Sequence, residues 1–206
     1  MILNIHGYGG SAQNSAYTAL LSLGCDVTSP QLDYDAVCPE KVLKTLREMA
    51  VTCHADTLIG TSFGGFFAAL LCAELHLPTI LVNPCLMPFD VLPRLGNTQP
   101  IQPLMVLFSK LAAIDSSLVH CIIGAEDEVI GDHAFTKRLL CDADLVQVPN
   151  GRHSGATLPL QSFFQTILGK YGQHLRKKHC QLKTVPKFAG NFGTVLYFQT
   201  SAIVLK

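Results

Sequence analysis

The stretch that decides the fold is LIGTSFGGFFAALLCAEL, residues 58–75, in which one serine stands between glycines. A short apolar run that favours a β-strand, Thr57 to Gly60, precedes this serine. A longer run, Phe63 to Leu75, follows it and carries Ala and Leu at a density typical of a helix. Ser62 therefore lies at a predicted junction between a strand and a helix, inside the pattern G-x-S-x-G.

A serine at such a junction is in a position to act as a nucleophile. The sharp turn lifts the hydroxyl clear of the backbone, and small neighbours prevent clashes where the strand and the helix approach each other. The amide of Phe63 begins the helix, where free N–H groups and the positive end of the helix dipole stabilise negative charge. The alternative is that the pentapeptide occurs by chance and that Ser62 only caps the helix.

Strands and helices alternate along the rest of the chain. Apolar runs predict strands at 2–5, 25–28, 57–60, 78–83, 118–123 and 145–148. Helices are predicted at 12–23 (with Ser11 as cap), 39–53, 63–76, 102–113, 131–141 and 157–171. The strands are continuously apolar, which is typical of sheets covered on both faces. The pattern predicts a three-layer, doubly wound α/β fold with about six mostly parallel strands.

A nucleophilic serine needs a base, usually histidine, and a carboxylate that orients the base. On this type of sheet the acid and then the histidine follow the serine along the chain. Asp127, three residues after the turn glycine Gly124, follows the fifth strand, and His153 follows the sixth in a loop of small residues. We therefore predict Asp127 and His153 as the partners of Ser62.

Other candidates receive different interpretations. Glu126 and Glu128 are interpreted as solvated neighbours of Asp127, and Asp132 as the cap of the helix that begins near Ala134. The remaining histidines lie at helix ends, inside a strand, in the basic C-terminal segment or directly after the first strand. His6, in this last position, is expected to form hydrogen bonds within its loop.

The loop His6-Gly-Tyr-Gly-Gly10 follows the first strand and predicts the second half of an oxyanion hole. We expect the Tyr8 amide to act together with the Phe63 amide. A phosphate cradle is the weaker alternative, because neither G-x-G-x-x-G nor GK[ST] is present. If the first strand lies beside the third, the strand order is 2-1-3-4-5-6. The reversal of order then places Tyr8 and Ser62 side by side, where such sheets bind ligands.

Five segments together, HGYGG, GTSFGG, VNPCLMPF, GAEDEVI and NGRHSG, resemble the α/β-hydrolase superfamily and, more closely, the small YqiA-type serine esterases. The resemblance spans roughly residues 1–170. It implies the α/β-hydrolase fold and hydrolysis of carboxylic esters or thioesters, with Ser62, Asp127 and His153 as a catalytic triad. It also implies a compact fold in which 86–117 is the only room for a short cap. The HGYGG loop departs from the HG-F-x-S-S pattern of these esterases by its additional glycines.

The expected substrate is a small ester or thioester, and the mechanism requires no cofactor and no metal ion. We predict an apolar acyl pocket with contributions from Tyr8, Leu86, Met87 and Phe89, although ordinary core packing is the better explanation for each side chain taken singly. Two alternatives remain open. One is a non-catalytic binding protein of the same fold, and the other is a hydrolase of peptide, C–C or polyester bonds.

Charge divides the chain into two predicted parts. All fifteen Asp and Glu lie at or before Asp144, whereas residues 170–206 carry seven Lys or Arg and no acid. We predict a catalytic domain at 1–171 and a basic extension rich in β-prone residues at 172–206. The extension could add an edge strand, mediate self-association or lie outside the natural fold. Its basic run is too short and too poor in aromatic residues to predict a nucleic-acid partner.

Composition bounds these interpretations. The 206 residues, 49% of them hydrophobic, suffice for one domain with a full core. No apolar run reaches the roughly eighteen residues of a membrane span, and the N-terminus does not resemble a signal peptide, so a cytoplasmic location is expected. Eight cysteines without a C-x-x-C pair are interpreted as reduced, mostly buried residues and not as a disulfide or zinc framework.

Overall fold

The computed structural model describes residues 1–169. The predicted extension at 172–206 therefore lies outside the described residues, as does any self-association through it. None of the helices in residues 1–169 combines the length and apolar character needed to cross a membrane. Seven of the eight cysteines lie in this part and are free thiols. Cys72, Cys85 and Cys121 are buried, whereas Cys141 is exposed.

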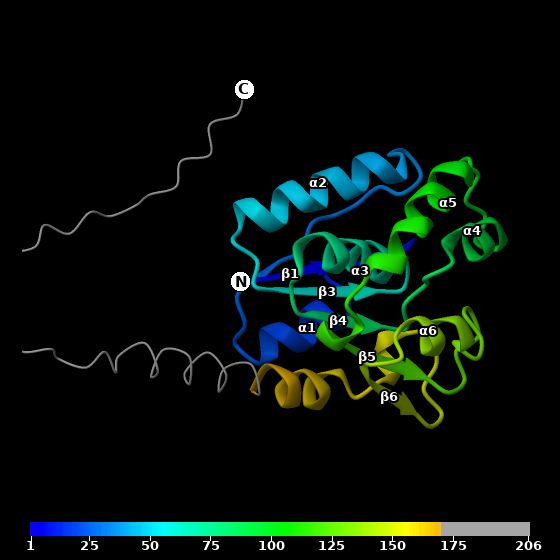
Figure 1. Cartoon of the computed structure of the whole chain (residues 1–206). Helices are drawn as coiled ribbons and strands as arrows, with labels where there is room; N and C mark the ends of the chain where they lie inside the picture. The colour runs from blue at the N-terminus through cyan, green and yellow to red at the C-terminus, as the bar shows by residue number, and fades with distance from the viewer. Residues whose placement is uncertain (170–206) are drawn as a thin grey trace, which may run out of the picture. The chain divides into compact units, whose positions relative to one another are not determined.

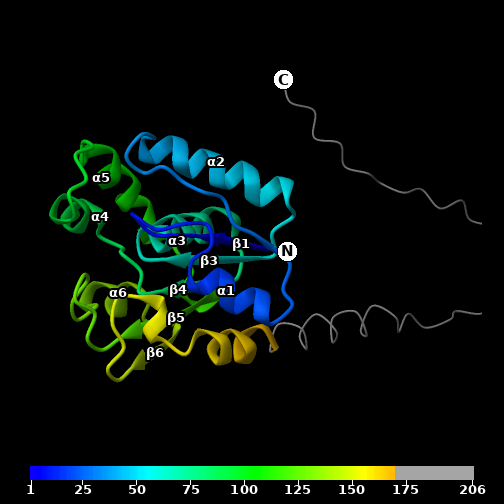
Figure 2. The same ribbon diagram turned by 180° about the vertical axis from the view of Figure 1, so that it is seen from behind.

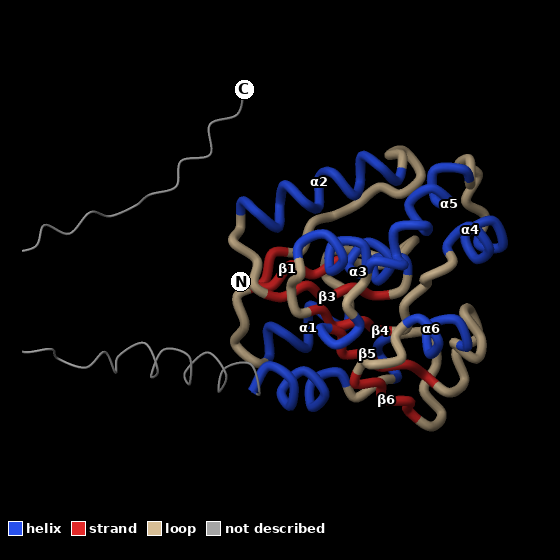
Figure 3. Tube along the Cα trace, viewed as in Figure 1, coloured by secondary structure: helices blue, strands red, loops and turns tan. Residues whose placement is uncertain are grey.

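A single parallel sheet forms the centre of the protein (Figure 3). Its strands are β1 (Ile2–Ile5), β2 (Val27–Thr28), β3 (Thr57–Thr61), β4 (Thr79–Val82), β5 (Val119–Gly124) and β6 (Asp144–Val148). Their order, β2-β1-β3-β4-β5-β6, is the predicted one, and every neighbouring pair is parallel. Ile5 at the end of β1 lies opposite Gly60 of β3. The loops that follow these two strands therefore begin next to each other, as expected at the reversal of strand order.

Helices cover both faces of the sheet and confirm the three-layer architecture. They are α1 (Ser15–Ser22), α2 (Pro39–Thr52), α3 (Phe63–Leu75), α4 (Pro88–Val91), α5 (Gln102–Phe108) and α6 (Ala134–Leu139), and residues 160–169 are also helical. Short 3-10 turns lie at Leu92–Leu95, Ser109–Ala113, Ser116–Leu118 and Gly155–Thr157. Figure 1 shows α3 in front of the strands, and Figure 2, from behind, shows α1 and residues 160–169 in front.

The central helix α3 is the most buried helix among the described residues. Every residue from Phe63 to Cys72 is buried, and Phe66 and Phe67 are fully enclosed. Burial of one large apolar side chain stabilises a fold by about 1.5–3 kcal/mol. The packing of α3 against β3 and β4 therefore anchors the first turn of the helix, where Ser62 lies.

Several element boundaries differ from the sequence-based prediction. The first helix begins at Ser15 and not at residue 12, because the Asn14 side chain, and not that of exposed Ser11, accepts the hydrogen bond from the Tyr17 amide (2.9 Å). Strand β2 has two residues and not four. The helix expected at 102–113 is α5 followed by a 3-10 turn. The segment predicted as a cap, 86–117, consists of short helices and turns.

Candidate active site

Ser62 occupies a strained turn between β3 and α3. Its backbone angles are φ 53° and ψ −121°, a combination that costs a non-glycine residue about 1–3 kcal/mol. Three backbone hydrogen bonds of 2.9 Å hold the turn: the Ser62 amide donates to Val82, and the Ser62 carbonyl accepts from Gly65 and Cys85. The neighbouring elements thus maintain a conformation that the residue alone disfavours.

Two glycines make this turn possible by leaving room for their neighbours. A Cβ on Gly60 would lie 2.6 Å from the Cβ of Ala68, so the end of β3 and the first turns of α3 could not approach each other. A Cβ on Gly7, in the loop after β1, would lie 2.8 Å from the Cβ of Ser62. Glycine is therefore needed at both positions for the serine to sit between the two loops.

The structure brings together the three residues predicted as a triad. The Ser62 hydroxyl lies 2.9 Å from Nε2 of His153. Nδ1 of the same ring lies 2.9 and 3.0 Å from the two carboxylate oxygens of Asp127. An ionised carboxylate only accepts hydrogen bonds, so Nδ1 carries the ring hydrogen and Nε2 presents its lone pair to the serine hydroxyl. The imidazole is thereby set to receive the serine proton.

Asp127 is enclosed and strongly hydrogen-bonded. Its side chain has no exposed surface, and its Oδ1 accepts from the amides of Val129 (2.9 Å) and Ile130 (2.8 Å). Burial by itself raises the pKa of Asp127. Hydrogen bonds from His133, His153 and the Ile130 amide outweigh burial and hold the pKa of this carboxyl well below its usual range. Asp127 is therefore a fixed negative charge behind His153.

Sequence reasoning missed two residues that hold the His153 loop. The fully buried Asn83, at the end of β4, donates from Nδ2 to the carbonyls of Arg152 (2.8 Å) and His153 (2.9 Å). Its Oδ1 accepts from the Gly124 amide at 2.7 Å, so one side chain joins the ends of β4 and β5 to the histidine loop. A polar residue at the end of an apolar strand, directly before Pro84, was the available signal.

Glu128 is the second such residue, and its predicted role as a solvated neighbour is incomplete. Its side chain is half exposed, but Oε2 accepts from the His153 backbone amide at 3.1 Å and pairs with Arg152 at 3.5 Å. Backbone hydrogen bonds, the one from His153 included, lower the pKa of Glu128. The loop that carries Asp127 and Glu128 therefore binds both the side chain and the backbone amide of His153. Asp132 does accept from the Ala134 amide (2.9 Å), as expected of a cap.

The loop after β1 carries Tyr8, one of the two residues predicted as oxyanion donors. Within residues 1–169, no hydrogen bond occupies the backbone amides of Tyr8 and Phe63, the two predicted donors. His6 does not serve as a base: its Nδ1 donates to the Gly7 carbonyl (2.8 Å), and its Nε2 accepts from the Leu32 amide (2.9 Å). Burial lowers the pKa of His6, which is consistent with this accepting nitrogen. His6 thus holds the loop in place, and the Tyr8 backbone amide has no hydrogen-bond partner in residues 1–169.

The crevice at Ser62 is lined mostly by glycines and by residues with polar side chains, whereas the sequence suggested a pocket of large apolar side chains. Its volume is about 480 Å³, and it is lined by the loop after β1, by the start of α1 and by the turns that carry Ser62 and His153. Apart from His153, no ionisable group but the Tyr8 phenol lines it. Ser11, Gln13 and Ser15 line the crevice with side chains that have no hydrogen-bond partner within residues 1–169.

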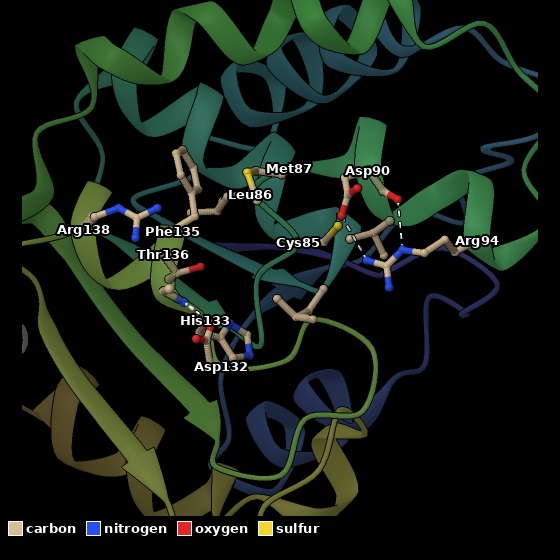
Figure 4. Close-up of a pocket in the computed structure, with 13 residues that line it drawn as sticks. Cys85, Leu86, Met87, Asp90, Arg94, Asp132, His133, Phe135, Thr136 and Arg138 are labelled. Carbon is tan, nitrogen blue, oxygen red and sulfur yellow. Dashed lines mark hydrogen bonds and ion pairs between the residues drawn. The ribbon is translucent and has the colours of Figure 1, made fainter.

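The predicted pocket residues lie in different places. Tyr8 lines the crevice at Ser62, and its hydroxyl donates to Asp35 (2.9 Å). Leu86 and Met87 line a separate pocket of about 160 Å³ between the segment after β4 and helix α6 (Figure 4). Phe89 lines neither of these pockets and packs edge-on against Phe108, with ring centres 5.0 Å apart. Only Tyr8 of the four is brought to the crevice that holds the serine.

The Cys85 thiol is another potential nucleophile near the turn. Cys85 lies close to Ser62, since its backbone amide donates to the Ser62 carbonyl. Its side chain is buried, and burial raises the pKa of the thiol to about 12. The reactive thiolate form is therefore absent near neutral pH, which leaves Ser62 as the group suited to nucleophilic attack.

Comparisons with solved structures agree with this architecture. An α/β hydrolase enzyme from the metagenome of sediments of the Mar Chica lagoon, Morocco, is 18% identical, with TM-score 0.59 over 84% of this chain and 90% of that chain. Est1E from Butyrivibrio proteoclasticus, solved with ferulic acid, is 16% identical, with TM-score 0.56 over 82% and 89%. A structure reported with the carboxylesterases of Nitrososphaera gargenis is 14% identical, with TM-score 0.52 over 86% and 91%. At these identities the likeness shows the fold.

Sequence comparisons assign the family. No curated protein matches the chain. The model of an uncharacterised protein family, UPF0227, matches residues 1–120, a segment that contains β1, the Ser62 turn and Asn83. With the sheet order and the solved relatives, this match places the protein in the α/β-hydrolase superfamily. The chain belongs to the UPF0227 family, the YqiA-like branch of α/β hydrolases that its motifs resemble.

Proposed function

We propose that the protein is a serine hydrolase that cleaves carboxylic esters or thioesters through an acyl-enzyme on Ser62. The observation that carries the proposal is the 2.9 Å contact between the Ser62 hydroxyl and Nε2 of His153, at a strained turn beside an open crevice. The carboxylesterase and the ferulic-acid complex among the solved relatives add support from proteins of the same fold.

In the first half-reaction, His153 accepts the hydroxyl proton at Nε2 while Oγ of Ser62 attacks the carbonyl carbon of the ester. The amides of Phe63 and Tyr8 donate to the oxyanion that forms. Asp127 stabilises the doubly protonated imidazole through Nδ1. The tetrahedral intermediate then collapses, the bond to the leaving group breaks, and His153 transfers its proton to the departing alcohol or thiol.

In the second half-reaction, water takes the place of the leaving group. His153 removes one water proton, and the hydroxide attacks the acyl carbon and forms a second oxyanion at the same two amides. Collapse breaks the bond to Oγ, the proton returns from His153 to Ser62, and the carboxylic acid leaves. His153, only partly exposed, is thus base and acid in turn.

The polar side chains of the crevice favour a substrate whose group bound there is short and uncharged. Free hydroxyl and amide groups of Ser11, Gln13 and Ser15 offer hydrogen bonds, whereas a long alkyl chain would leave them unpaired. We therefore expect kcat/KM to be higher for p-nitrophenyl acetate than for p-nitrophenyl octanoate.

Hydrolysis of p-nitrophenyl acetate by the wild type and by Ser62→Ala tests the function. Loss of the nucleophile is expected to lower kcat by about 10⁶-fold. Thr136→Val, a near-isosteric change outside the crevice, is the control for expression and handling and is expected to retain activity. Equal turnover by the wild type and Ser62→Ala would leave the non-catalytic binding protein as the better interpretation.

A further inference from the structure

Asp127 binds a second imidazole besides that of His153. Nε2 of His133, the residue before α6, lies 2.9 Å from Oδ2 of Asp127, and neither side chain has any exposed surface. Because the carboxylate only accepts, His133 must carry a hydrogen on Nε2 and donate it. In the sequence, His133 is only one of the histidines at predicted helix ends, so this contact is new information about the site.

His133 is held there against two unfavourable features. Its backbone is left-handed, with φ 53° and ψ 26°, a conformation uncommon for a residue with a side chain. Its Nδ1 is buried and has no hydrogen-bond partner within residues 1–169. Backbone strain and an unpaired buried nitrogen persist where the surrounding structure imposes them, most often at functional sites. The bond to Asp127 is the one polar contact that the ring makes there.

The donors around Asp127 approach its carboxylate from two sides. The amides of Val129 and Ile130 bind Oδ1, His133 binds Oδ2, and His153 bridges both oxygens. Without His133, only His153 would remain on Oδ2, and the carboxylate could turn about its Cβ–Cγ bond toward the two amides. The orientation of His153 toward Ser62 depends on that carboxylate plane.

We propose, resting on the function proposed above, that His133 is a positioning residue that holds the Asp127 carboxylate in the plane required by His153. It does not contact the substrate or the reacting atoms. Figure 4 shows it on the wall of the smaller pocket, beside Asp132, with the Asp90–Arg94 pair on another part of that wall.

The proposal includes an effect on pH dependence. The His133 hydrogen bond draws part of the negative charge of Asp127 away from His153. Without this hydrogen bond, Asp127 would present its full negative charge to His153 and stabilise the doubly protonated imidazole, which is the inactive form. The acid limb of kcat/KM should therefore move to higher pH. Within residues 1–169, the other charged or titratable groups that line the two pockets or contact these loops are Tyr8, Cys85, Asp90, Arg94, Glu128, Asp132, Arg138 and Arg152.

Two amide substitutions at position 133 test whether a hydrogen-bond donor must lie at the position of Nε2. Gln places its amide nitrogen near the position of Nε2, whereas the shorter Asn places it near Nδ1, too far from Asp127. Asn also tolerates a left-handed backbone, so His133→Asn is expected to fold. The matched control is Thr136→Val, on a buried residue of the same pocket for which no bond to Asp127 occurs.

The experiment measures kcat and KM for p-nitrophenyl acetate from pH 5 to 9. His133→Asn is expected to lower kcat by about 10- to 100-fold, the range seen when a partner of a metal ligand is lost, with KM nearly unchanged and the acid limb at higher pH. His133→Gln should restore most of kcat and the wild-type profile. Equal impairment of the Asn and Gln variants, or a wild-type profile in His133→Asn, would overturn the proposal.

A measurement without substrate keeps this inference separate from the proposed function. In protein labelled with ¹⁵N-histidine, the Nδ1–H of His153 should exchange with water faster in His133→Asn than in the wild type and in His133→Gln. Unchanged exchange in His133→Asn contradicts the positioning role whether or not the protein hydrolyses esters. Failure of the function itself would appear in the Ser62→Ala comparison.

Discussion

The two sides of the Ser62 turn are built in opposite ways. On the side of Asp127 and His153, side chains bind one another and the backbone of two loops, and Asn83 uses both ends of its amide. On the side of the crevice, Ser11 and Gln13 have exposed side chains with no partner within residues 1–169. Under the proposed function, the first side would fix the geometry of proton transfer, and the second would be available for hydrogen bonds to a substrate.

The largest expected effect lies on the connected side. Asp127→Asn is expected to lower kcat by about 10⁴-fold, because an amide stabilises the wrong tautomer of His153 and supplies no negative charge. Steady-state kinetics with p-nitrophenyl acetate checks this, with Asp132→Asn as control, since that carboxylate only accepts from the Ala134 amide. A stronger effect of Asp132→Asn would move the acid of the triad to Asp132.

Asn83→Ala should give the next largest effect and affect stability as well as rate. It leaves the Gly124 amide and two carbonyls of the histidine loop without their partner, at a cost of about 3 kcal/mol in unfolding free energy. Displacement of His153 by about 1 Å should lower kcat by about 10²-fold. Urea unfolding and kinetics measure both. Loss of stability with full activity would show that Asn83 supports the fold but not the position of His153.

The pH dependence of the free energy of unfolding tests the side of Asp127 and His153 without a catalysed reaction. The folded-state pKa of Asp127 is lowered, so its contribution to stability is present above the ordinary carboxyl value of about 3.9 and is lost as the pH falls below it. The free energy of unfolding of the wild type should therefore fall more steeply from pH 5 to pH 2 than that of Asp127→Asn. Parallel curves for the two proteins would contradict this assignment.

The smallest effects are expected on the crevice side. Gln13→Ala and Ser15→Ala should change the free energy of unfolding by less than about 0.5 kcal/mol, because these side chains make no hydrogen bond within the described fold. With p-nitrophenyl acetate the rates should stay within about tenfold, while the preference for acetate over octanoate should weaken. A large loss of stability in either variant would remove the contrast between the two sides.

Much of the fold, and the meeting of Ser62, His153 and Asp127, could be predicted because the signals are local. Apolar runs identified all six strands, and the order 2-1-3-4-5-6 followed from placing HGYGG beside the serine turn. Ser62, Asp127 and His153 lie in the turns and loops that follow β3, β5 and β6, so the parallel sheet brings them to one edge. The predicted domain boundary at 171 and the role of the extension at 172–206 stay predictions.

The contacts between loops could not be predicted in this way. Three hydrogen bonds depend on how separate loops meet in space: the bond from His133 to Asp127, the bond from the His153 amide to Glu128, and the bond from Asn83 to the histidine loop. The choice of Asn14 over Ser11 as helix cap depends on how far the glycine loop extends before the helix begins. The substrate-binding role of Leu86 and Met87 stays a prediction, because these side chains line a pocket that does not contain Ser62.

The central claim is that Ser62 is the nucleophile, and covalent labelling tests it most directly. A fluorophosphonate probe followed by peptide mass spectrometry is expected to modify Ser62 alone. Labelling should be lost in Ser62→Ala and greatly slowed in His153→Ala, while buried Cys85 stays unmodified by iodoacetamide in the folded protein. A label on any other residue, or undiminished labelling of Ser62→Ala, would contradict the account.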